Sequence, residues 1–190
     1  MTQAPPPGVE LRALVADDVP RVAEIERQLF GPSAWTEAML AGELRAPGRW
    51  YLAATAGDEV VGYAGLWFDG DVTQVMTIGV AAPVQRQGVG AALLAALVER
   101  SRELGATGVL LEVRVDNAPA MALYEQFGFT VLARRRRYYQ PEDVDAWTMR
   151  LDLGTGPEPE LVAQAEADAV ADDDLGGELA PSDEPNTLST

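Results

Sequence analysis

The stretch VQRQGVGAALLAAL, residues 84–97, places two glycines and an arginine directly before a run rich in alanine and leucine. This run has helical apolar spacing, so a helix is predicted from about Gly90 to Leu104, closed by Gly105. A glycine turn before a helix leaves backbone N–H groups unpaired, and the helix dipole favours an anion at that point. The turn is therefore either a phosphate-binding loop or an ordinary connection.

Two common phosphate-binding patterns fail at this loop. The Walker A pattern needs a lysine followed by serine or threonine, and the chain contains no lysine. The dinucleotide fingerprint needs a third glycine, and Leu93 stands in its place. What remains is the pattern Q-x-x-G-x-G, formed by Gln85, Arg86, Gln87, Gly88, Val89 and Gly90.

Around this loop, apolar patterns predict an α/β (α+β) fold in which helices pack on a mixed sheet. A first helix is predicted after a cap at Asp17 or Asp18, a second near Thr36, and a short last one after an N-cap at Asn117. A turn at Gly57 and Asp58 joins two of the strands. The strands are predicted at 9–13, at two places within 50–68, and at 73–81, 108–115, 129–139 and 145–153.

The chain of 190 residues divides by composition into a flexible lead-in at 1–8, one domain at 9–153 and an acidic tail at 154–190. The tail has ten acidic and no basic residues, and its shortage of large apolar residues predicts disorder. It is either a solvating appendage or a segment for a basic partner. No apolar run of about 18 residues and no charged-then-apolar leader is present, which predicts a soluble cytoplasmic protein without membrane contact.

The residue types exclude much chemistry. Without histidine, cysteine or lysine, the chain cannot form a Ser-His-Asp triad, a catalytic thiolate or a Schiff base, and no metal site is expected. Proton transfer must use Asp, Glu, Tyr or the substrate. The net charge of −16 argues against direct nucleic-acid binding and favours a basic partner. The basic run Arg134 to Arg137 is weak evidence for nucleic acid in so acidic a chain. The oligomeric state is not indicated.

The glycine loop and its surroundings resemble the GCN5-related N-acetyltransferases (GNAT), which hold the diphosphate of acetyl-CoA on backbone N–H groups. MTIGV before the loop, LEVRVDNAPAMALYEQFGF after it and RRRRYY beyond are similar in order and spacing to the RimI-like ribosomal-protein-alanine acetyltransferases. The resemblance covers roughly 9–153. It implies the GNAT fold, a mostly antiparallel mixed sheet with a splayed central strand pair and flanking helices, and acetyl-CoA as co-substrate.

The resemblance also implies which residues contact the coenzyme. Ile78 to Val80 would line the pantetheine arm and the thioester, and Arg86 to Ala91 would surround the pyrophosphate. Core packing is the plainer role for the side chains of Ile78 and Val80, and helix capping for Asn117. The implied coenzyme contacts are Ile78, Gly79, Val80, Gln85, Arg86, Gln87, Gly88, Val89, Gly90, Ala91 and Asn117.

Glu112 and Tyr124 are the candidate catalytic residues. Glu112 is an isolated acid in the apolar run LLEVRV. Burial of its carboxylate is costly unless the carboxylate is paired or its pKa is raised. A raised pKa would suit a general base. The plainer alternatives for Glu112 are a solvated face or a pair with Arg114. By resemblance Glu112 is the base and Tyr124 the general acid that protonates the departing thiolate. A tyrosine between Met121 and Phe127 would otherwise be a core residue.

On the acceptor side, the resemblance places Trp35, Tyr138 and Tyr139 at the rim, although aromatics at element ends often only pack. The implied reaction is acetyl transfer to the N-terminal alanine of a small-subunit ribosomal protein, through its basic N-terminal segment. Two alternatives stay open: an acetyltransferase for a small-molecule amine or for many protein N-termini, and a non-catalytic acetyl-CoA-binding adaptor.

Overall fold

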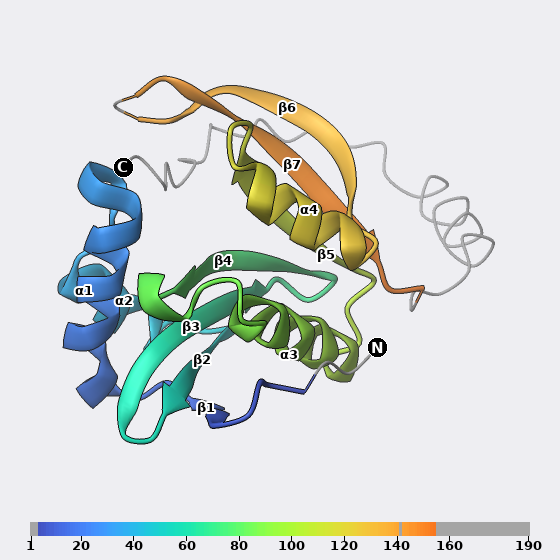
Figure 1. Cartoon of the computed structure of the whole chain (residues 1–190). Helices are drawn as coiled ribbons and strands as arrows, with labels where there is room; N and C mark the ends of the chain where they lie inside the picture. The colour runs from blue at the N-terminus through green and yellow to red at the C-terminus, as the bar shows by residue number, and fades with distance from the viewer. Residues whose placement is uncertain (1–3, 141, 155–190) are drawn as a thin grey trace, which may run out of the picture.

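The computed structural model describes residues 4–140 and 142–154, and a single seven-stranded sheet runs through them (Figure 1). Its strand order is β1-β2-β3-β4-β5-β7-β6. Neighbouring strands are antiparallel except β4 and β5, which pair in parallel. The strands are β1 Val9–Ala13, β2 Arg49–Ala56, β3 Glu59–Phe68, β4 Val72–Val80, β5 Gly108–Arg114, β6 Thr130–Tyr139 and β7 Val144–Asp152. This mixed, mostly antiparallel sheet is the predicted one.

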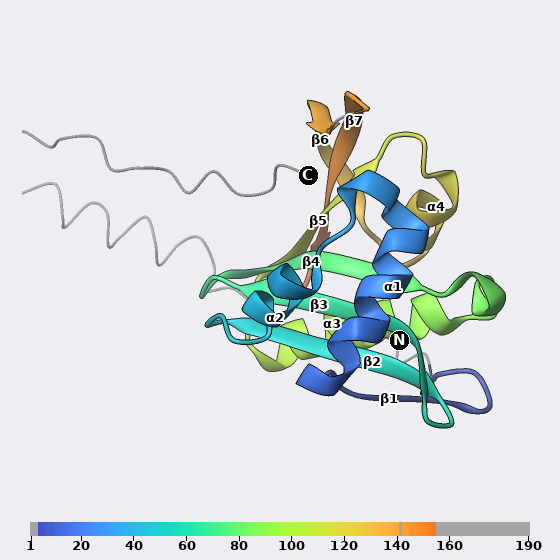
Figure 2. The same ribbon diagram turned by 90° about the vertical axis from the view of Figure 1, so that its left-hand side faces the viewer.

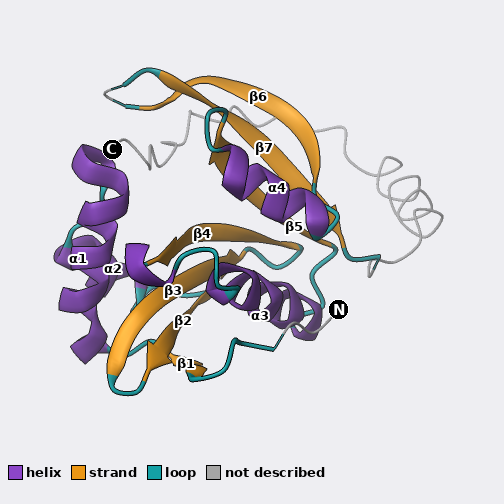
Figure 3. Cartoon of the chain, in the orientation of Figure 1, coloured by secondary structure: helices purple, strands orange, loops and turns teal. Residues whose placement is uncertain are grey.

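In the described residues, four α-helices cover the sheet on both faces, as Figures 2 and 3 show. On one face α1 packs Val22 and Ile25 against Tyr63 of β3. On the other face α3 contributes Leu93 and Leu97 to the larger apolar core. The helices are α1 Val19–Phe30, α2 Glu37–Glu43, α3 Val89–Glu103 and α4 Ala118–Gln126. The sheet separates between β4 and β5, and a cleft lies at this separation.

The predicted caps of α2 and α4 are confirmed. The hydroxyl of Thr36 accepts a hydrogen bond from the backbone N–H of Met39 at 3.2 Å, and the side-chain oxygen of Asn117 accepts one from Ala120 at 3.2 Å. Both bonds satisfy a donor that the first helical turn leaves free.

The predicted cap of α1 is corrected. Asp18 occupies the N-cap position but makes no side-chain cap bond. Its carboxylate instead accepts two hydrogen bonds from Arg12, at 2.6 and 2.8 Å, and one from the N–H of Val15. The Arg12 guanidinium lowers the pKa of Asp18. A bidentate ion pair to a neighbouring strand is stronger than a cap bond to one amide, so the tertiary contact prevails over the local one.

The centre of the sheet opens because β4 leaves β5. The parallel pairing of β4 with β5 covers only Val72, Thr73 and Gln74, whereas β4 stays paired with β3 as far as Val80. The splayed strand pair expected from the family resemblance is therefore present. From residue 75 onward β4 has a free edge toward β5.

A β-bulge lies at the same point. Leu66 of β3 pairs with Val75 and Gly65 with Thr77, so Met76 is an extra residue in β4. An extra residue reverses which face the following side chains occupy. Val75 consequently packs in the core on the α3 side, while Thr77 reaches α1 on the other side. The bulge thus brings a polar β4 side chain to α1.

The described residues contain no helix that is long and apolar enough to cross a membrane. The lead-in and tail predicted at 1–8 and 154–190 lie largely outside the described residues, which omit 1–3 and 155–190. Within the described part of the lead-in, the carbonyl of Pro6 accepts a hydrogen bond from the N–H of Val9 at the start of β1.

Candidate active site

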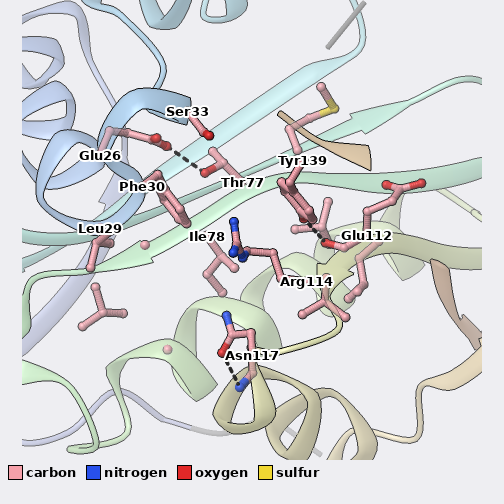
Figure 4. A pocket seen from close by; sticks show the side chains of 18 of the residues that line it. Glu26, Leu29, Phe30, Ser33, Thr77, Ile78, Glu112, Arg114, Asn117 and Tyr139 are labelled. Carbon is pink, nitrogen blue, oxygen red and sulfur yellow. Dashed lines mark hydrogen bonds between the residues drawn. The ribbon is translucent and has the colours of Figure 1, made fainter. Parts of the chain in front are cut away.

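A cavity of about 710 Å³ occupies the opening between β4 and β5 (Figure 4). This volume is typical of a site for a sizeable small molecule. Its wall is built from the free part of β4, the glycine loop, the end of β5 and α4, and on the far side from α1 and the turn after β6. The cavity therefore joins the loop near α3 to a second opening between α1 and the β6–β7 hairpin.

The glycine loop has the geometry of an anion-binding turn. Gly88, the N-cap of α3, has φ +93°, and Arg86 has φ +63°. Two residues of the loop therefore have a left-handed backbone conformation. Within the described part of the chain, no backbone hydrogen bond is donated by the amides of residues 86–91. Side-chain bonds from Gln85 to the Val80 carbonyl and from Gln87 to the Pro83 carbonyl hold the turn in place. Free amides at a helix N-terminus fit a pyrophosphate.

The predicted coenzyme contacts are mostly brought together. The cavity is lined by Ile78, Gly79, Val80, Gln85, Arg86, Gly90 and Asn117. Gln87, Gly88, Val89 and Ala91 are not among the lining residues, and the side chain of Val89 is buried in the core. Any contact of Val89 with a coenzyme would therefore use its backbone N–H. A free strand edge, free amides and a cavity of this size together fit acetyl-CoA.

Glu112 lies at the cavity wall with its side chain 12% exposed. One carboxylate oxygen accepts a hydrogen bond from Gln74 at 2.9 Å, and the other pairs with Arg135 of β6 at 3.2 Å. Pairing thus compensates the burial of this acid. The alternative pair with Arg114 does not form, because Arg114 binds Asp116 at 3.0 and 3.1 Å.

Tyr124 lies on α4, is 5% exposed and lines the same cavity. Burial raises the pKa of its hydroxyl to about 12. The centre of its ring lies 5.8 Å from the centre of the Phe129 ring. Tyr124 is therefore both a buried residue and part of the cavity wall, and near neutral pH its phenol carries a proton.

At the second opening of the cavity, Trp35, Tyr138 and Tyr139 all line the wall, which is where the acceptor rim was predicted. The hydroxyl of Tyr139 donates a hydrogen bond of 3.3 Å to the backbone carbonyl of Glu112. A further contact was not predicted: the hydroxyl of Ser33 donates to the carbonyl of Gln140 at 3.0 Å. This bond joins the segment after α1 to the turn after β6 across the cleft.

Two cavity residues were missed by the sequence analysis. Glu26 of α1 is 2% exposed and accepts hydrogen bonds from the hydroxyls of Tyr63 and Thr77 and from the N–H of Trp35, at 2.6, 2.9 and 3.2 Å. Arg114 points into the cavity, with its guanidinium 5.5 Å from the ring centre of Tyr139 (Figure 4). Glu26 follows Val22 by four residues and Ile25 by one, so it lies on the buried face of α1. A carboxylate on that apolar face is the sequence signal that could have revealed it.

The residues described by the structure contain no group of three or more Asp or Glu side chains placed to hold a metal ion. What the cavity offers is a set of proton-transfer groups, Glu112 and Tyr124, beside free backbone donors. This combination suits acyl transfer to a nucleophile.

Comparison with known proteins identifies the class to which this fold and cavity belong. The sequence model of the acetyltransferase (GNAT) family matches residues 17–129, which is more than half of the chain. The chain belongs to the GNAT acetyltransferase family. It is an acetyl-CoA-dependent N-acetyltransferase, since acetyl-CoA is the co-substrate of this family.

Within that family the chain is similar to RimI proteins. It is 42% identical over 151 residues to the N-alpha-acetyltransferase RimI of Mycobacterium tuberculosis, covering 77% of this chain and 94% of that protein. It is 33% identical to the ribosomal protein bS18-alanine N-acetyltransferase of Escherichia coli K12, covering 75% and 97%. The crystal structure of the ribosomal-protein-S18-alanine N-acetyltransferase from Escherichia coli matches with a TM-score of 0.72 at 30% identity, covering 79% and 97%.

Proposed function

We propose that this enzyme acetylates the N-terminal α-amine of a protein, and that its acceptor is the N-terminal alanine of a small-subunit ribosomal protein. The observation that carries the proposal is that Glu112 and Tyr124 face one cavity, between the free edge of β4 and the rim formed by Trp35 and Tyr139. The names of the relatives support the acceptor.

The basic character of the acceptor segment is part of the proposal. The chain has 30 acidic and 14 basic residues, and opposite charge accelerates association and aids the choice of partner. A basic N-terminal segment of a ribosomal protein fits this balance. Such an acceptor would place the reaction in the cytoplasm.

Glu112 is the proposed general base. Bound acetyl-CoA supplies the acetyl group and a thiolate leaving group. Glu112 takes the proton of the acceptor amine, directly or through one water, as the nitrogen bonds to the acetyl carbon. The pair with Arg135 and the bond from Gln74 fix the direction of the carboxylate. An α-amine has a pKa of about 8, against about 10.4 for lysine, so less work is needed to deprotonate it.

Tyr124 is the proposed general acid. Because burial raises the pKa of Tyr124 to about 12, its hydroxyl keeps a proton to give to the sulfur as the C–S bond breaks. A backbone N–H near Val80, on the free edge of β4, is proposed to stabilise the negative charge on the acetyl oxygen. The proton count balances, since one proton leaves the amine and one reaches the thiolate.

The experiment that tests the acceptor is thiol release from acetyl-CoA with two peptides. The first is an alanine-starting ribosomal peptide, and the second is the same peptide with a blocked N-terminus and an internal lysine. We expect release only with the first peptide. Equal release with both, or release only with small amines, would contradict the proposal. A panel of other N-terminal residues then measures how strict the enzyme is.

The acidic tail, residues 154–190, lies outside the proposed catalytic unit. We propose that residues 9–153 form the catalytic domain. A chain ending at Leu153 should retain the acetyl transfer rate of the full chain. A large loss of the transfer rate in the shortened chain would contradict this division of the chain.

A further inference from the structure

Among the residues that the structure describes, the buried carboxylate of Glu26 has three hydrogen-bond donors and no cationic partner. Its partners are the hydroxyls of Tyr63 and Thr77 and the N–H of Trp35. No arginine forms an ion pair with it within residues 4–140 and 142–154. An ionised carboxylate in this position carries a negative charge that the surrounding groups orient but do not neutralise.

Glu26 and Glu112 face the two ends of one short segment of β4. Glu112 bonds to Gln74 and Glu26 bonds to Thr77, three residues further along the strand. Three residues of a strand span about 10 Å. Both carboxylates line the cavity, so an amine lying over this part of β4 would lie between them.

The two carboxylates differ in whether a positive charge lies beside them. The charge of Glu112 is opposed by the guanidinium of Arg135, at 3.2 Å. The charge of Glu26 is held among neutral donors, in a protein environment that screens charge less than water does. Near neutral pH an α-amine with a pKa of about 8 arrives mostly as a cation. An ammonium group that enters the acceptor end would therefore be attracted by the charge of Glu26, which no cation neutralises.

We propose that Glu26 is a specificity-determining residue, whose buried carboxylate draws the acceptor's α-ammonium group into the cleft and holds it near Glu112. This inference rests on the proposed function, because it concerns the same acceptor. It gives the cleft two acids with separate roles, since Glu26 selects the charged form of the amine and Glu112 removes the proton.

The decisive variant is Glu26→Gln. Glutamine keeps an oxygen for the Trp35 N–H, and its amide can donate to the hydroxyl oxygens of Tyr63 and Thr77, which rotate to accept. The variant thus removes the charge and keeps the hydrogen bonds. Glu125→Gln is the matched control, because Glu125 is an exposed acid on α4 and the change in net charge is the same.

The measurement is equilibrium binding of two peptides, in the presence of coenzyme A as the non-reactive partner. One is the alanine-starting ribosomal peptide, and the other is the same peptide with a propionyl group in place of the alanyl residue, which lacks only the amine. The wild type and Glu125→Gln should prefer the amine peptide on the order of tenfold at pH 7. Glu26→Gln should lose most of this preference, with unchanged affinity for acetyl-CoA.

A second variant separates charge from packing. Tyr63→Phe removes one donor and leaves the carboxylate, so it should keep the preference for the amine peptide. The inference is overturned when Glu26→Gln retains the wild-type preference, or when Tyr63→Phe loses it to the same degree. Failure of the proposed function is a different result, namely a wild type that transfers no acetyl group to the amine peptide.

Discussion

The hydroxyl of Ser33 lies 3.0 Å from the carbonyl oxygen of Gln140 and donates a hydrogen bond to it, although the two residues are 107 positions apart in the sequence. Ser33 ends the short turn after α1, and Gln140 follows β6. Both line the cavity. This bond links the turn after α1 and the β6–β7 hairpin at the proposed acceptor end of the cavity.

Removing the hydrogen bond between Ser33 and Gln140 should weaken binding of the acceptor peptide and leave acetyl-CoA binding unchanged. Ser33→Ala is expected to raise the KM for the acceptor peptide by about two- to tenfold, because a hydrogen bond of this kind contributes about 1 kcal/mol. The KM for acetyl-CoA should not change. Thr130→Ala, which removes a hydroxyl bond on β6 away from the cavity, is the control and should leave both constants unchanged. A higher KM for acetyl-CoA alone would contradict the assignment of this end to the acceptor.

The two glycines of the loop should respond differently to alanine. Gly88 has φ +93°, which alanine rarely adopts, so Gly88→Ala should destabilise the loop by about 1–2 kcal/mol and weaken acetyl-CoA binding. At Gly90 an added Cβ would lie 3.7 Å from Val80 and 3.9 Å from Leu123, which is ordinary contact. Alanine also favours the first helical turn, so Gly90→Ala should fold at least as stably as the wild type.

Acetyl-CoA titration and thermal unfolding of both variants test this contrast. Equal losses of affinity in Gly88→Ala and Gly90→Ala, with both proteins folded, would show that the backbone conformation at Gly88 is not what the site requires.

Tyr124→Phe should slow the chemical step without unfolding the protein. Within the described residues the hydroxyl of Tyr124 makes no hydrogen bond, so its removal should cost less than about 1 kcal/mol of stability. The kcat for peptide acetylation should fall by about 10²-fold if the hydroxyl donates the proton. Because the pKa of Tyr124 is raised to about 12, its hydroxyl should stay protonated below about pH 10. The kcat of the wild type should therefore not fall through deprotonation of Tyr124 in that range. Unchanged kcat in the variant would reject the role.

The pH dependence of stability should reveal Glu26. Burial raises the pKa of Glu26, and the hydrogen bonds from Tyr63, Trp35 and Thr77 act in the opposite direction. A raised folded-state pKa means that stability is greatest below the unfolded value and is lost as pH rises through the folded value. Glutamine does not titrate. The difference in Tm, Glu26→Gln minus wild type, should therefore increase as the pH rises from about 4.3, the ordinary value for glutamate, toward neutrality.

Thermal unfolding of both proteins across this range measures the difference. Acids with lowered pKa, such as Asp18, are present in both chains and cancel in it. A difference in Tm that stays constant with pH would mean that Glu26 does not titrate in this range.

Local signals were the part of the fold and site that the sequence could predict. The Thr36 and Asn117 caps, the turn at Gly57 and the glycine loop each depend on a few neighbouring residues, and the structure contains them. Asp18 shows the limit, because its local capping potential was overridden by Arg12 on the adjacent strand.

The unpredicted part depends on contacts between distant segments. Glu26 meets Thr77 across 51 positions, and Glu112 meets Arg135 across 23. The first pair needs the bulge at Met76, which turns Thr77 toward α1 and leaves no mark in the alternation of apolar residues. Such partners follow from the register of strands and from the path of a helix over the sheet, which no short window of sequence determines.

The most direct test of the proposed mechanism is thiol release from acetyl-CoA by the wild type and by Glu112→Gln, with the alanine-starting ribosomal peptide as acceptor. Glutamine keeps the size of the side chain and its bond to Gln74 while removing the base. The mechanism predicts turnover lower by about 10²- to 10⁴-fold in the variant, with acetyl-CoA affinity unchanged. Turnover equal to that of the wild type would contradict the assignment of Glu112 as the base that prepares the amine.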